Sequence, residues 1–124
     1  MALTTEADQQ RAEALAQLLL DRGLVACVSL QPVTSLYHWN GRIERSQEVQ
    51  LLCKTSASSL PALEAAVRAL HSYDTPEWLA WPATASADYA AWLAGVVAPG
   101  AETLNPGAGP EVLGDRPGGG GPAG

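Results

Sequence analysis

Residues 34–47 read TSLYHWNGRIERSQ, and this stretch decides how the chain folds. Its centre, Asn40-Gly41, supplies two residues that tolerate the positive φ angles of a type I′ turn, which is the preferred turn of two-residue β-hairpins. Extended, partly aromatic and β-branched segments lie on both sides of it. We therefore predict a hairpin of strands 34–39 and 42–54, with the residues that flank the turn directly opposite each other.

The segment before the hairpin predicts a helix and then a strand. Apolar residues at helical spacing follow Thr5, which we predict to be the N-cap, so the helix is expected from Glu6 to Arg22. Gly23 suits the left-handed residue that ends a helix. The short apolar run Leu24–Leu30 then predicts a strand bounded by glycine and proline.

The segment after the hairpin predicts helix, strand and helix. A second helix is expected after Ser58 or Ser59, because one apolar stripe recurs there at helical spacing: Leu60, Leu63, Val67 and Leu70. Pro76 then favours an extended chain, and we predict a strand at Glu77–Trp81. Ser86 is the expected cap of a last helix, whose apolar face would hold Tyr89, Trp92, Leu93 and Val96.

This order of elements is typical of an α+β, ferredoxin-like βαββαβ sandwich with an added C-terminal helix. It requires Ala2–Thr5 to be the remnant of a first strand, which we expect to be truncated, with the true start upstream. Residues 1–98 form the predicted domain. Residues 99–124 hold nine Gly and five Pro without an aromatic residue, so we expect a disordered tail.

Charge and cysteine content limit the classes of binding partner and the compartment that we expect for this protein. The formal net charge is −6, and the six basic residues of the domain are scattered, which argues against a nucleic-acid partner. No apolar run reaches the length of a membrane span, and the start does not resemble a signal peptide. Cys27 and Cys53 lie in apolar stretches without metal-finger spacing, which is typical of reduced thiols in a cytoplasmic protein.

Four motifs together resemble the CutA family of divalent-cation tolerance proteins. They are Ala-Cys-Val at 26–28, Tyr-x-Trp-x-Gly at 37–41, Lys54-Thr55, and His-x-Tyr-x-x-Pro-Glu at 71–77. The resemblance runs from about Leu3 to Val97. It implies a ferredoxin-like fold assembled as a homotrimer, similar to the PII signalling proteins, and an association with copper or another divalent cation.

Two further positions depart from the pattern of that family. Ser72 stands where the family usually has proline, so we expect a less rigid loop, and Ser29 stands where it usually has asparagine.

His71 and Cys27 are the candidate metal ligands. An imidazole just after a helix suits a metal, and a thiolate suits Cu(I). The alternatives stay open: His71 can cap the helix by bonding a terminal carbonyl, and Cys27 can be a small buried apolar residue. Cys53 and Glu77 are weaker candidates.

A second set of residues is expected at a cleft between subunits, where packing or hydrogen bonding across the interface is the alternative to ligand capture. It comprises Tyr37, Trp39, Lys54, Tyr73, Asp74, Glu77 and Trp81. In an extended segment Tyr73 and Glu77 project to one side and can share a pocket, while Asp74 projects to the other.

Four functions compete at this level. The first is a metal-binding homotrimer that takes part in metal tolerance. The second is a PII-like signalling module, against which the chain offers no glycine-rich phosphate loop, and the third is a scaffold that recruits a partner protein. An enzyme is the weakest, because no nucleophile or oxyanion site is recognisable.

Overall fold

The computed structural model describes residues 1–98 and contains four strands and three α-helices within that range. In chain order they are β1 (Ala2–Glu6), α1 (Gln9–Asp21), β2 (Cys27–Trp39), β3 (Arg42–Lys54), a 3₁₀ turn at Ala57–Ser59, α2 (Leu60–Leu70), β4 (Leu79–Ala80) and α3 (Ala87–Val96). The strands form one antiparallel sheet in the order β2-β3-β1-β4. This confirms the ferredoxin-like prediction with its extra helix, while the expected tail lies outside the described residues.

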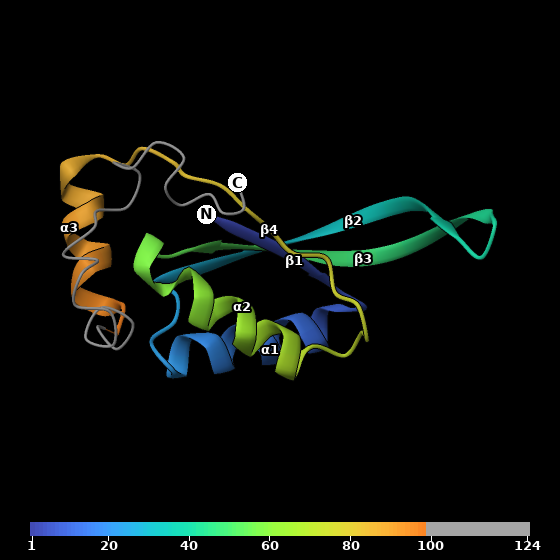
Figure 1. Ribbon diagram of the computed structural model, residues 1–124, viewed down its shortest axis with the longest axis horizontal. Coiled ribbons are helices and arrows are strands. Elements are labelled where there is room, and N and C mark those ends of the chain that lie inside the picture. The colour runs from blue at the N-terminus through green and yellow to red at the C-terminus, as the bar shows by residue number, and fades with distance from the viewer. Residues whose placement is uncertain (99–124) are drawn as a thin grey trace.

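Both α1 and α2 pack on one face of the sheet (Figure 1). Because side chains alternate along a strand, the buried Val49, Leu51 and Cys53 of β3 point to this face and contact the helices. The helices contribute their own apolar stripes, Leu15 and Leu19 among them. We call the opposite side of the sheet the open face. None of the described helices lies over the centre of the open face in Figure 1. None of them is long and apolar enough to cross a bilayer.

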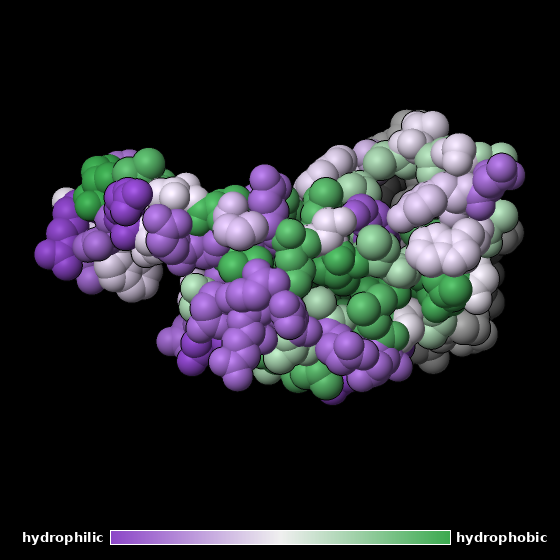
Figure 2. Space-filling model, turned by 180° about the vertical axis from the view of Figure 1, so that it is seen from behind, coloured by the Kyte–Doolittle hydropathy of each residue, from purple (hydrophilic) through white to green (hydrophobic). Residues whose placement is uncertain are grey.

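The hairpin has the register expected of a two-residue loop. Trp39 pairs with Arg42, and Asn40 and Gly41 have φ of 51° and 79°. Residues 34–47, which we call the arm, extend well beyond the helices (Figure 1). Figure 2 shows the arm from behind, clear of the body and with apolar side chains near its end. Leu36 and Ile43 are 69% and 61% exposed there.

The prediction of two separate strands before the turn was wrong. β2 is continuous from Cys27 through Pro32, which is paired in register with Val49. A proline disrupts a central strand because it has no N–H to donate to the ladder, but β2 is an edge of the sheet, where a residue whose nitrogen faces outward needs no donor.

The predicted start of the first helix was also wrong. Thr5 and Glu6 belong to β1, where they pair with Gln50 and Val49, and α1 is capped instead by Asp8. The Asp8 carboxylate accepts the Arg11 backbone N–H at 2.8 Å. Pairing of β1 with β3 over all five residues outweighs the local capping signal of Thr5.

The last strand is shorter, and the last helix less buried, than predicted. β4 comprises only Leu79 and Ala80, which pair with Leu3 and Ala2, and the backbone of Trp81 exchanges two further hydrogen bonds with Met1 at 3.0 Å. Ser86 caps α3 as expected, by accepting the Tyr89 N–H. Leu93 is the buried residue within α3, whereas three other members of its predicted apolar face are 39–47% exposed: Tyr89, Trp92 and Val96.

Candidate functional site

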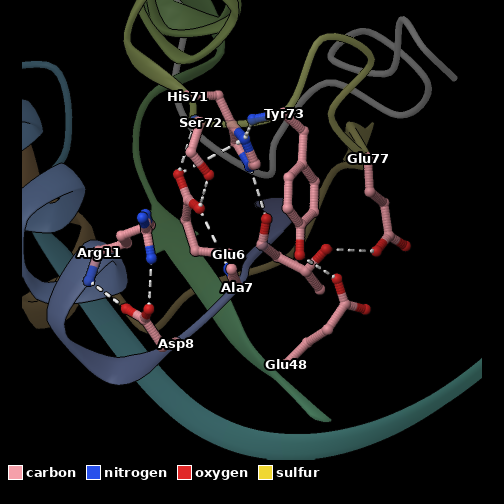
Figure 3. Close-up of polar contacts among 10 residues, drawn as sticks. Glu6, Ala7, Asp8, Arg11, Glu48, His71, Ser72, Tyr73 and Glu77 are labelled. Carbon is pink, nitrogen blue, oxygen red and sulfur yellow. Dashed lines mark hydrogen bonds and ion pairs between the residues drawn. The ribbon is translucent and has the colours of Figure 1, made fainter. Parts of the chain in front are cut away.

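The segment after α2 passes around the C-terminal end of β1 and contacts both of its faces (Figure 3). On the helix side it meets Glu6, whose side chain is 2% exposed. The Glu6 carboxylate accepts three hydrogen bonds: from the Ser72 N–H at 3.0 Å, the Ser72 hydroxyl at 2.5 Å and the Ala7 N–H at 3.1 Å. These bonds compensate the burial of a charged group.

The side chain of His71 is fully buried, and both of its ring nitrogens have partners within the chain. Nδ1 accepts the Tyr73 N–H at 2.9 Å, so the ring proton lies on Nε2, which donates to the Thr5 carbonyl at 2.5 Å. The 3.5 Å separation between Nδ1 and Glu6 Oε2 is too long for a strong hydrogen bond. His71 therefore ties the segment after α2 to β1, through a strand carbonyl rather than the helix-end carbonyl expected of a cap.

On the open face the same segment brings oxygen-bearing side chains together (Figure 3). The Tyr73 hydroxyl donates to Glu48 Oε2 at 2.7 Å, and the Thr5 hydroxyl donates to Glu77 Oε1 at 3.4 Å. Within residues 1–98 neither Glu48 nor Glu77 forms an ion pair. We call Glu48, Tyr73 and Glu77 the oxygen cluster.

Tyr73 stays protonated in this environment. Burial raises its pKa, and donation to the negatively charged Glu48 raises it further. The phenol is thus a hydrogen-bond donor at neutral pH, which leaves the two carboxylates as the anionic members of the oxygen cluster.

The two cysteines lie on opposite faces of the sheet. Cys27 is paired with Lys54 on the open face, where the Lys54 ammonium is 3.8 Å from Cys27 Sγ and also bonds the Ser29 hydroxyl. Cys53 points into the core, and burial raises its pKa to about 12. Cys53 is therefore a poor ligand, because a thiol binds metal as the thiolate.

The predicted ligands His71 and Cys27 do not meet within one chain. His71 bonds Thr5, which pairs with Gln50, whereas Cys27 pairs with Lys54 four residues further along β3. Four residues of strand span about 13 Å. Over residues 1–98, no three His, Cys, Asp or Glu side chains are grouped so that they could hold a metal ion.

The residues predicted for an intersubunit cleft fall into two groups. Tyr37 projects from the same face as Glu44 and Glu48, and its hydroxyl bonds Ser46 at 2.8 Å, so it adds a polar group of the arm to the face that carries the oxygen cluster. The others lie apart: Trp39 at the turn of the arm, Asp74 exposed in the loop, Lys54 beside Cys27, and Trp81 bonded through its backbone to Met1. A cleft between subunits stays a prediction.

Sequence reasoning missed Glu6 and Glu48. Glu6 was predicted to be the first residue of a helix, and Glu48 is one of the two acidic residues of β3, so neither residue carried a local signal. Their partners lie 66 and 25 residues away, and only the register of β1 and β3 places them.

Fold and site define a class: small ferredoxin-like α+β proteins whose sheet keeps one face open beside a polar loop. Residues 1–96 match the family model described as CutA1 divalent ion tolerance protein. The chain belongs to this CutA1 family.

Three relatives illustrate the match. The divalent-cation tolerance protein CutA of Pectobacterium atrosepticum is 43% identical over 93 residues, which are 73% of this chain and 84% of that protein. The structure of CutA from Synechococcus elongatus has a TM-score of 0.75 at 38% identity, covering 78% of this chain and 88% of that one. The PII-like protein CutA from a Nostoc species, solved in apo form, has a TM-score of 0.74 at 31% identity, covering 78% and 95%.

Proposed function

We propose that this chain forms a homotrimer that binds a divalent cation at the junction between subunits and acts in this way in metal tolerance. The oxygen cluster supplies part of the coordination shell, and a neighbouring copy supplies the rest. The observation that carries the proposal is the pair of carboxylates, Glu48 and Glu77, directed to one region of the open face without a cationic partner in residues 1–98.

The chemistry of these donors suits a divalent ion. Carboxylate and phenol oxygens are ligands for hard and borderline cations, and two carboxylates without a cationic partner would attract such an ion. The ammonium of Lys54 beside Cys27 makes the thiol side of the open face less favourable for a cation, by charge repulsion. We therefore place the ion at the oxygen cluster rather than at Cys27.

A second copy is needed for two reasons. Two carboxylates and a protonated phenol fall short of the six to eight oxygens of a Ca²⁺ site, so a neighbouring copy would have to supply further ligands for such an ion. In addition, the arm carries exposed apolar side chains that nothing in residues 1–98 covers, including Leu36, Trp39 and Ile43. Association of copies through the arm would bury this surface and bring further side chains to the oxygen cluster.

The test combines mass and affinity measurements on the full chain. Light scattering at micromolar concentration should give three times the mass of one chain. Calorimetric titration with Zn²⁺, Cu²⁺, Mn²⁺ and Mg²⁺, and with Cu(I) under reducing conditions, should find at least one ion bound with a micromolar or tighter Kd.

Variants locate the ion. Glu48→Gln combined with Glu77→Gln should abolish binding, whereas the exposed control Glu13→Gln, which removes one charge on α1, should leave it intact. Cys27→Ala and His71→Ala separate the alternative ligands. Binding that survives the double glutamate variant but is lost in Cys27→Ala would refute the oxygen cluster, and a well-behaved monomer would refute the shared site.

A PII-like signalling module is the second candidate. It is favoured by the likeness to the Nostoc protein and by the arm, whose exposed faces could carry a signal to a partner. Thermal shift with nucleotides and small anions separates the two functions, because a ligand at a hundred times its Kd adds about 2.7 kcal/mol of stability. A shift with such a ligand and none with cations would favour this candidate.

A further inference from the structure

We propose that Glu6 is a positioning residue for the oxygen cluster, although it lies on the other face of the sheet. It acts through Ser72, which bonds Glu6 directly and, together with the neighbouring His71, holds the loop that carries Tyr73 and Glu77. The inference rests on the proposed function for its effect on cation affinity, while its effect on loop geometry can be measured without any ion.

The geometry follows from the alternation of β1. Thr5 and Glu6 are neighbours in the strand, so Thr5 faces the open side and Glu6 faces the helices. The loop after α2 contacts both: Ser72 bonds Glu6 on the helix side, and Glu77 accepts a hydrogen bond from Thr5 on the open side. The end of β1 is therefore held between the two ends of one loop, as Figure 3 shows.

The contacts on the helix side are the stronger ones. Glu6 takes two hydrogen bonds from Ser72, and its carboxylate is buried, whereas Thr5 and Glu77 are joined by a single bond of 3.4 Å. Hydrogen bonds to a charged, desolvated acceptor are roughly twice as strong as neutral ones. Tyr73 is then fixed by its own N–H on His71 and by its hydroxyl on Glu48.

Glu6→Gln tests this role with almost no change of shape. Glu6 Oε2 accepts the Ser72 N–H, and Oε1 accepts both the Ala7 N–H and the Ser72 hydroxyl. An amide has one oxygen, so one of the two backbone N–H groups must face the NH₂ group and loses its acceptor. Glu13→Gln is the matched control, because it removes the same charge from an exposed site.

Two readouts are expected to change in Glu6→Gln and not in Glu13→Gln. Amide exchange of Ser72 or of Ala7, whichever N–H loses its acceptor, should become about tenfold faster, and cation affinity should fall about tenfold, both as expected for one lost charge-assisted hydrogen bond. If Glu6→Gln does not fold, Ser72→Ala removes only the hydroxyl and should give smaller changes of the same sign. Faster exchange with unchanged cation affinity would overturn the inference.

A third readout separates this inference from the proposed function. The chain has three Tyr and no Phe, so tyrosine ring resonances can be assigned in the ion-free protein. Movement of the Tyr73 resonances in Glu6→Gln, with those of Tyr89 unchanged, supports positioning even if the wild type binds no cation and the proposed function fails. Static Tyr73 resonances would overturn it.

Discussion

Gly23→Ala should destabilise the domain through a contact at the far end of the described chain. Gly23 follows α1 with φ of +69°, and its carbonyl accepts the Ala98 N–H at 2.7 Å. A Cβ placed on Gly23 would lie 2.8 Å from Ala98 Cβ, which is closer than such atoms approach, and 3.2 Å from Ala98 N, which is a tight contact. The substitution therefore strains the turn and also pushes away Ala98, which lies two residues beyond the end of α3.

The magnitude has two parts. A non-glycine residue in the left-handed region costs about 1–2 kcal/mol. Displacement of Ala98 adds roughly the value of one hydrogen bond, about 0.5–1.5 kcal/mol. We expect a total of about 2–3 kcal/mol, measured as the change in free energy of unfolding in urea at fixed protein concentration.

Gly41→Ala is the matched control. Gly41 has φ of +79°, but a Cβ there would have nothing within 4 Å, so only the backbone part of about 1–2 kcal/mol applies. In the double variant Gly23→Ala with Ala98→Gly, the closest contact is absent and part of the loss should be recovered. Equal losses for Gly23→Ala and Gly41→Ala would refute the role given to Ala98.

Three further predictions concern single side chains. Tyr73→Phe removes the hydrogen bond to Glu48 and should cost about 1 kcal/mol in urea unfolding. Iodoacetamide at pH 8 should label Cys27 in the native protein and spare the buried Cys53, as measured by mass spectrometry. The thiol of Cys53 keeps its proton until about pH 12 in the folded chain but loses it near pH 9 in the unfolded chain. The free energy of unfolding should therefore fall as pH rises between these two values, and it should fall less in Cys53→Ala. Asp8→Ala should lower the melting temperature above pH 4, and the difference should shrink as pH falls, since the Arg11 backbone N–H lowers the pKa of Asp8 and this stabilisation is lost on its protonation.

Local signals predicted most of the fold. Asn40-Gly41 determined the hairpin and its register, because those two residues satisfy the turn without help from distant parts of the chain. The errors arose where pairing decides between two local options. Thr5 looks like a helix cap in isolation, and only its pairing with Gln50 makes it a strand residue.

The candidate site was predictable only in part for the same reason. His71, Tyr73 and Glu77 are concentrated within seven positions, so the sequence alone singled out their loop. Glu48 and Glu6 join them from strands that are distant in sequence, and a carboxylate in a strand has no pattern that distinguishes it from a solvated one.

The length of the arm offers a way to follow the oligomeric state of the protein. A two-stranded ribbon in water is marginally stable by itself, so the amides near its turn should open and exchange rapidly in an isolated chain. Any neighbour that covers the ribbon would slow that exchange without altering the helices. Deuterium uptake at residues 36–45, compared across dilutions, would then serve as a gauge of self-association that needs neither label nor ligand.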